Sequence, residues 1–197
     1  MADQPLTKRH LHQPPGRVFS DTEDIYQYLL AREAQEPWPQ RTTDLSVVRT
    51  GLATGVTTFI VLSPTVYGRG LGSFKKTSFQ GPTLVRAALK RGRAVYVGDD
   101  GAAKWDHVHI EDVAALYEIL VGRVLAGAAD LPSGEKGFFF ATSGKHSWRA
   151  LAEAVGRAGH ELGALDTPEA VSVSLAEFAK DWCWGNEGVA ELAFASG

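Results

Sequence analysis

Residues 57–70 read TTFIVLSPTVYGRG, and this stretch decides the fold. The run 57–62 is β-branched and aliphatic without alternation, which is typical of a strand that is covered on both faces in a parallel sheet. Pro64 ends the run, and a glycine-rich loop over 63–70 follows at the carboxyl end of the strand. Ligands gather at that end of the strands in α/β sheets, so this loop is a candidate binding element.

The alternation of strands and helices continues on both sides of this stretch. A short helix from about residue 42 ends at Gly51 or Gly55, while Ser147 and Ser174 have the chemistry of helix N-caps. Further helices are predicted at 21–36, 82–91, 111–125 and 147–158, and further strands at 94–97, 137–141 and 171–173. We expect the strands at 57–62 and 94–97 to be neighbours in a mixed or parallel sheet.

The composition is that of an ordinary globular protein. Of the 197 residues, 44% are hydrophobic and 22% are charged, which excludes a disordered, collagen-like or coiled-coil chain. The single cysteine, Cys183, forms no internal disulfide, which indicates a reducing compartment. The first residues lack the pattern of a secretory signal, and no apolar stretch is long enough for a membrane helix. We therefore expect a cytoplasmic protein without a membrane partner.

Charge is unevenly distributed along the chain. Residues 45–98 carry eight basic side chains and no acidic one, although the net charge of the whole chain is −3. This segment is either a rim that attracts an anionic ligand or an ordinary solvated surface. The net negative charge and the lack of an RNA-binding or helix-turn-helix motif argue against nucleic acid as a partner.

Five blocks of sequence carry a resemblance to a known family. They are Ser63-Pro-Thr-Val-Tyr67-Gly, Val97-Gly-Asp-Asp-Gly101, Trp105-Asp-His-Val-His109-Ile-Glu-Asp112-Val-Ala, Phe138-Phe-Phe-Ala and Ser147-Trp-Arg-Ala-Leu151-Ala-Glu. In this order, over residues 42–163, they resemble the second half of the extended short-chain dehydrogenase/reductase family, the nucleotide-sugar epimerase and dehydratase group. The resemblance implies an α/β fold with the later strands of a partial Rossmann-like sheet and a small C-terminal substrate lobe. It also implies that 42–197 is the C-terminal half of an NAD(P)-binding domain and that 1–41 is an irregular lead segment, a remnant of the upstream half.

The resemblance further implies where a cofactor and a substrate would lie. Beside the nicotinamide ribose of NAD or NADP it places Pro64, Thr65 and Tyr67. Toward the substrate it places Trp105, Asp106 and His107. Trp105 stands where nucleotide-sugar enzymes of the family have an arginine that grips the diphosphate. We therefore expect a small-molecule carbonyl or sugar-like substrate, with a preference for uncharged or aromatic carbonyl compounds.

Two elements of the family are absent from the sequence. Gly68, Gly70 and Gly72 lack the G-x-G-x-x-G spacing of a dinucleotide turn. The family has a tyrosine and a lysine as its acid–base pair, and by family spacing that pair falls near Trp38 and Thr42, which lack this chemistry. We therefore expect a truncated chain that binds no dinucleotide by itself.

The catalytic residues stay unknown. Tyr28 and Arg32 have the spacing of the pair but lie about ten residues too early, and arginine does not simply replace lysine; alternatively, Tyr28 packs on a helix face. Two functions remain. One is an NAD(P)-dependent epimerase, dehydratase or carbonyl-reductase-like protein. The alternative is a non-catalytic fragment or interaction module that pairs with a full-length relative, and homo-oligomers are left open.

Two histidines alternate along an extended segment. His107 and His109 can therefore lie on one face, with Asp106 adjacent. A metal site would need a third ligand in fixed geometry, and none is evident, so we expect no metal. By family position, His109 is expected to satisfy backbone groups inside the protein.

Overall fold

The computed structural model describes residues 18–20 and 22–195, which form two compact units. Of these residues, unit 1 comprises 64–110 and 143–195, and unit 2 comprises 18–63 and 111–142. Each unit therefore combines segments that are distant in sequence. No helix among the described residues is long and apolar enough to cross a membrane. The predicted boundary after residue 41, between a lead segment and a C-terminal half, stays a prediction.

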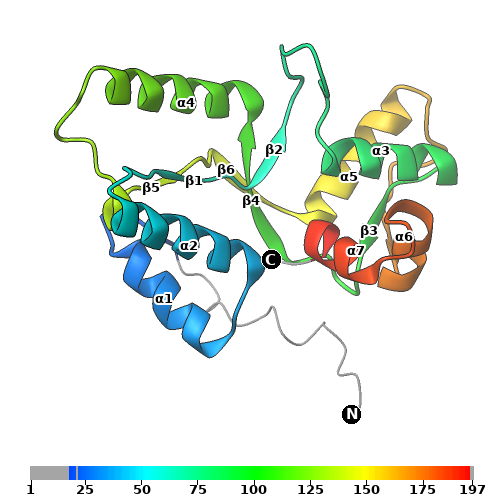
Figure 1. The fold of residues 1–197 in the computed structure, drawn as a ribbon. Coiled ribbons are helices and arrows are strands. Elements are labelled where there is room, and N and C mark those ends of the chain that lie inside the picture. Colours follow the sequence, from blue (N-terminus) through cyan, green and yellow to red (C-terminus); the bar gives the residue numbers. More distant parts are fainter. Residues whose placement is uncertain (1–17, 21, 196–197) are drawn as a thin grey trace. The chain divides into compact units, whose positions relative to one another are not determined.

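Unit 2 has helices on both sides of a pair of parallel strands. Strand β1 (Ile60–Leu62) pairs with β5 (Phe138–Phe140), with Ile60 opposite Phe138. Figure 1 shows α1 (Ile25–Gln35) and α2 (Pro39–Thr54) on one side of these strands and α4 (Ile110–Leu125) on the other. A short 3-10 helix, η2 (Gly134–Lys136), leads into β5. The buried core consists of Ile25, Tyr26, Leu45, Val48, Ile60 and Phe138.

Local sequence sets the helix ends in unit 2. The Asp24 side chain caps α1 by accepting the Gln27 backbone N–H at 3.0 Å. Pro39 occupies the first turn of α2, where no N–H donor is needed, and Gly55 ends the helix at a φ of 73°. α2 thus begins before the predicted start near residue 42, and Gly55 rather than Gly51 is its end.

Unit 1 contains a three-stranded sheet and a second pair of parallel strands. In the sheet, β4 (Lys104–His109) lies between the parallel β2 (Thr65–Tyr67) and the antiparallel β6 (Gly144–Ser147). In the pair, β3 (Val95–Val97) lies beside β7 (Val171–Val173). The helices are α3 (Gln80–Arg91), α5 (Trp148–Glu161), α6 (Leu175–Trp182) and α7 (Glu187–Phe194).

Aromatic side chains dominate the core of unit 1. Phe194 lies between Trp148 and Phe178, with ring centroids 6.0 and 4.9 Å apart, and all three side chains are fully buried. Each such burial stabilises the fold by about 1.5–3 kcal/mol. Ser147 and Ser174 begin α5 and α6 by accepting backbone N–H groups, as predicted.

The basic segment is partly neutralised within unit 1. Arg91 Nη1 lies 2.7 Å from Glu177 Oε1, and Lys90 Nζ lies 3.8 Å from Asp181 Oδ1. These pairs join the end of α3 to α6. For Lys90 and Arg91, the acidic partners thus come from a distant part of the sequence.

The predicted α/β class is confirmed, and each predicted helix and strand has a counterpart, although several ends differ. The expectation that the strands at 57–62 and 94–97 are neighbours is wrong, because β1 pairs with β5 and β3 with β7. Long crossovers bring these partners together, so the apolar pattern of one strand does not reveal its neighbour. The loop predicted over 63–70 also contains strand β2.

Candidate functional site

The predicted site residues gather on the three-stranded sheet of unit 1. β2 lies beside β4 with Thr65 opposite His107 and Tyr67 opposite His109. This register brings the predicted cofactor-side residues, Pro64, Thr65 and Tyr67, next to the predicted substrate-side residues, Trp105, Asp106 and His107. Their proximity is a property of the fold, and their roles stay predictions.

Tyr67 packs against both histidines of β4. Its ring centroid lies 5.6 Å from that of His107 and 5.2 Å from that of His109, edge to face in both cases. The next residue, Gly68, has a φ of 95°, and a Cβ there would overlap the His109 ring. Glycine at 68 therefore provides both the left-handed backbone and the space for that ring. His107 and His109 both face Tyr67, in agreement with their predicted alternation.

A third histidine, which the sequence did not single out, joins this cluster from β6. His146 lies opposite Trp105, and its Nδ1 is 3.1 Å from Nδ1 of His107. A hydrogen bond between two imidazole Nδ1 atoms requires one of them to carry the proton. Among the residues that the structure describes, no three His, Cys, Asp or Glu side chains are grouped as a metal site.

The electrostatics of the cluster favour a neutral ring at His146. Burial lowers the pKa of His146 below its ordinary value, the charge of His107 lowers it further, and the carboxylate of Asp106 raises it. Asp106 also has a cation nearby, since its Oδ1 lies 3.7 Å from Lys145 Nζ. Burial therefore favours the neutral form of His146, and one ion pair lies beside the cluster.

Two polar atoms of this sheet are buried without a hydrogen-bond partner among the described residues. They are the hydroxyl oxygen of Thr65 and Nε2 of His146. Leaving a buried polar group unpaired costs about 1–3 kcal/mol. Such atoms are candidates for binding a ligand, and here both flank His107, one from each neighbouring strand.

Trp105 packs toward the core of unit 1. Its ring centroid lies 6.3 Å from that of the buried Trp148, and the Trp105 side chain is half-buried at the edge of that core. Its position beside His146 in the register therefore gives the site an aromatic wall. No guanidinium is present at this position.

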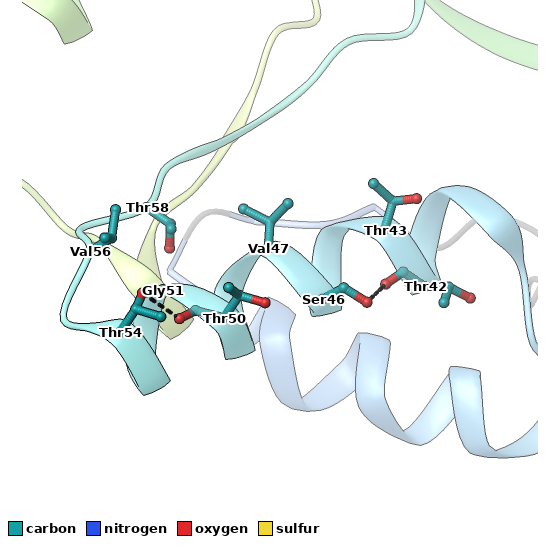
Figure 2. Close-up of a pocket in the computed structure, with 9 residues that line it drawn as sticks. All are labelled: Thr42, Thr43, Ser46, Val47, Thr50, Gly51, Thr54, Val56 and Thr58. Atoms are coloured by element: carbon teal, nitrogen blue, oxygen red, sulfur yellow. Dashed lines mark hydrogen bonds between the residues drawn. The ribbon is translucent and has the colours of Figure 1, made fainter.

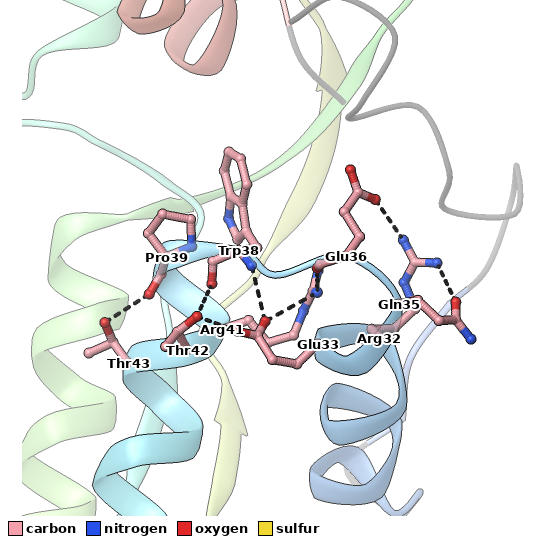
Figure 3. A network of polar contacts seen from close by, with 9 residues as sticks. All are labelled: Arg32, Glu33, Gln35, Glu36, Trp38, Pro39, Arg41, Thr42 and Thr43. Atoms are coloured by element: carbon pink, nitrogen blue, oxygen red, sulfur yellow. Dashed lines mark hydrogen bonds and ion pairs between the residues drawn. The ribbon is translucent and has the colours of Figure 1, made fainter.

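Residues 38 and 42, where the resemblance would place an acid–base pair, form a helix junction instead (Figure 3). Glu33 of α1 accepts the Trp38 backbone N–H at 3.0 Å and the Thr42 hydroxyl, and it lies 3.5 Å from Arg41 Nη1. The Thr42 hydrogen bond is the main reason why the pKa of Glu33 is lowered. Tyr28, the alternative, packs edge to face on Phe19 at 4.9 Å.

Unit 2 carries a shallow groove of about 530 Å³ along α2 (Figure 2). It is lined by Thr42, Thr43, Ser46, Val47, Thr50, Gly51, Thr54, Val56 and Thr58. Several hydroxyls of the groove already donate hydrogen bonds to helix carbonyls. The Ser46 hydroxyl donates to Thr42 O at 2.6 Å, and the Thr54 hydroxyl donates to Thr50 O at 2.8 Å. The groove therefore offers a ligand mostly methyl groups, and we assign it no function.

Comparisons with known proteins give partial matches. The sequence matches no protein-family model. It is 25% identical over 194 residues to the oxidase ucsJ of an Acremonium species, covering 91% of this chain and 55% of that protein. The chain thus spans about half the length of the curated relative it matches.

Two solved structures are similar over part of their length. A dTDP-glucose 4,6-dehydratase of Streptomyces venezuelae, DesIV, solved with NAD and TYD bound, is 23% identical with a TM-score of 0.44, over 66% of this chain and 35% of that one. The epimerase Mth375 of Methanothermobacter thermautotrophicus is 14% identical with a TM-score of 0.41, over 71% of this chain and 42% of that one.

Proposed function

We propose that this chain forms the substrate side of an NAD(P)-dependent oxidoreductase of the epimerase, dehydratase or carbonyl-reductase type. The observation that carries the proposal is the register of β2 on β4, which sets Thr65 opposite His107 and packs Tyr67 against His107. The similarity to a protein named as an oxidase, over 194 residues, supports redox chemistry. The sequence motifs that resemble the epimerase and dehydratase group support the reaction class.

The chemistry of the surface favours a neutral substrate. Tyr67, Trp105, His107 and His146 supply aromatic rings, and burial keeps the pKa of His146 low. The nearby Lys145 is paired with Asp106 at 3.7 Å, so it is not a free cation for a diphosphate. We therefore propose a carbonyl compound, uncharged or aromatic, whose oxygen accepts a hydrogen bond from the cluster.

Among the residues that the structure describes, the fit is to one end of a dinucleotide. Thr65 has a buried hydroxyl without a partner among the described residues, and Pro64 and Tyr67 flank it, which suits the nicotinamide end. A pyrophosphate needs a glycine turn at a helix N-terminus, and the sequence has no G-x-G-x-x-G. Gly68 does not substitute, because the His109 ring fills the space beside it. When bound, the cofactor would supply a hydride. No residue of this chain is proposed to bind its pyrophosphate.

Calorimetric titration tests the proposal. Acetophenone, a neutral aromatic ketone, is expected to bind, whereas UDP-glucose is expected to show no submillimolar binding. Tyr67→Ala should weaken acetophenone binding about threefold to tenfold, because an aromatic contact is lost. Tyr117→Ala is the matched control, since Tyr117 is 48% exposed on α4 and Tyr67 is 44% exposed. Submillimolar binding of UDP-glucose, or ketone binding that Tyr67→Ala leaves unchanged, would contradict the proposal.

A second candidate, an interaction module, is favoured by one observation on unit 2. α4 exposes large apolar side chains along one flank, with Tyr117 48%, Val121 52% and Leu125 82% exposed. Exposed apolar patches of this kind often mark protein interfaces. Sedimentation velocity separates the two candidates: association that Val121→Asp abolishes supports the module, and a monomer at high concentration contradicts it.

A further inference from the structure

His107 and His146 differ in what surrounds their Nε2 atoms. Their Nδ1 atoms are 3.1 Å apart, so each ring has only Nε2 left for another partner. Nε2 of His146 is buried and has no hydrogen-bond partner among the described residues. Nε2 of His107, a half-buried residue, instead lies beside Gly144, whose ideal Cβ would be 2.7 Å away. The two Nε2 atoms therefore have different surroundings.

This asymmetry decides which ring donates. If Nε2 of His146 carried the proton, it would be a buried N–H without an acceptor, which is rarer in proteins than a buried acceptor without a donor. The favoured arrangement puts the proton of His146 on Nδ1, from which it is donated to Nδ1 of His107. With Nδ1 as an acceptor, the neutral His107 ring carries its proton on Nε2. The His107 ring thus presents an N–H at Nε2.

We propose that His107 and His146 form a dyad in which His146 fixes His107 as the Nε2–H tautomer, a directed hydrogen-bond donor for the oxygen of a neutral carbonyl ligand. The ligand part of this inference rests on the proposed function. His146 is a positioning residue, because it acts through His107.

The groups around the dyad are compatible with a neutral donor. From β4, Asp106 and His109 flank His107, and from β2 the Tyr67 ring packs on it edge to face. From β6, Lys145 lies 3.7 Å from Asp106 and partly offsets the charge of that carboxylate. The dyad thus has one anion and one cation beside it, and these are paired with each other.

Gly144 lies beside the donating atom. An ideal Cβ at this position would lie 2.7 Å from Nε2 of His107. A side chain there would displace the His107 ring or cover its Nε2. Glycine at 144 therefore leaves room for the His107 ring, and any side chain there would crowd its Nε2.

Long-range ¹H–¹⁵N correlation of the histidine rings tests the dyad without a ligand. The ¹⁵N-labelled chain is measured at pH 8, above the ordinary imidazole pKa of about 6.5, and His107→Gln and His146→Gln assign the signals. His160 serves as an internal reference, because its Nδ1 lies 3.2 Å from Leu165 O and must donate to that carbonyl. His146 is expected to match the Nδ1–H pattern of His160. His107 is expected to show the Nε2–H pattern. A proton on Nε2 of His146, or an averaged signal from both tautomers, would overturn the proposal.

Acetophenone then tests the donor role. It is expected to shift Nε2 of His107 in the wild type and in Gly122→Ala, a control glycine with no atom within 4 Å of its Cβ position. Gly144→Ala is expected to abolish this shift and weaken binding about tenfold. Ketone binding by calorimetry that leaves His107 unshifted overturns the donor role. A chain that binds no ketone at all contradicts the proposed function, whereas the tautomer of His146 decides the dyad by itself.

Discussion

The imidazole of His109 occupies the space beside Gly68 in which a side chain would begin. Gly68 directly follows β2, whereas His109 ends the parallel strand β4, and Gly68 has a φ of 95°. The turn that follows β2 is therefore adapted to the neighbouring histidine. This contact also fixes the ring against which Tyr67 packs.

Gly68→Ala should destabilise unit 1. Alanine is strained at this φ, and its methyl group would overlap the His109 ring, so the free energy of unfolding should fall by about 1–3 kcal/mol. Urea unfolding followed by tryptophan fluorescence measures the change. Gly72→Ala is the control, because no atom lies within 4 Å of its Cβ position. Equal stability of the two variants would contradict the contact.

Thr42→Val should raise the pKa of Glu33 toward its ordinary value. The Thr42 hydroxyl is the largest cause of the lowered pKa, so its loss removes a donor that stabilises the carboxylate. A ¹³C NMR titration of the glutamate carboxyl groups measures this. Thr43→Val is the matched control, since the Thr43 hydroxyl donates to Pro39 O at 2.8 Å. The prediction fails if both variants titrate alike.

The lowered pKa of Glu33 also makes stability depend on pH. Its contribution is fully present above the ordinary pKa of 4.5 and is lost as the pH falls through the lowered folded-state value. The difference in free energy of unfolding between the wild type and Glu33→Gln should therefore shrink in acid. Urea midpoints of both proteins at pH 6 and at pH 3 measure this, and a difference that stays constant would contradict it.

His146 should make stability rise with pH near neutrality. Its pKa in the folded protein lies below the ordinary value of 6.5, so the unfolded chain binds more protons between the two values. The free energy of unfolding therefore rises with pH through that window and is level above it. The comparison is with His146→Gln, whose stability relative to the wild type should fall as the pH rises from 5 to 8. A pH-independent difference would show that burial does not penalise the charged ring.

The chain by itself should not turn over a dinucleotide. Most of the affinity for such cofactors comes from a glycine turn that this sequence lacks. Titration with NADPH should give no saturable fluorescence enhancement, and acetophenone should cause no NADPH oxidation above a heat-treated control. Micromolar NADPH binding by a monodisperse sample would mean that another part of the chain binds the pyrophosphate.

Local signals were sufficient for the helices and for the strands with strongly apolar sequences. The caps Ser147 and Ser174 and the run Phe138–Phe140 act over a few residues, so their elements follow from sequence alone. The strands β2 and β6 do not follow from sequence alone. Each is short and becomes a strand only when β4 supplies hydrogen-bond partners. Pairing of distant segments therefore limited the prediction of the fold.

The same limit applies to the candidate site. His107 was identified from the motif around Trp105, but His146 lies in the polar sequence Gly144-Lys-His-Ser, which carries no strand pattern. Its contact with His107 depends on the antiparallel register of β4 and β6. The members of the site on one segment were thus predictable, and their partner across the sheet was not.

Backbone chemical-shift mapping with acetophenone tests the central claim most directly. If the chain forms the substrate side of a carbonyl-directed site, the largest shifts should fall on β2, β4 and β6, at Tyr67, His107 and His146. Shifts concentrated instead along α2, at the groove lined by Ser46 and Thr50, would place the ligand in unit 2 and contradict the account.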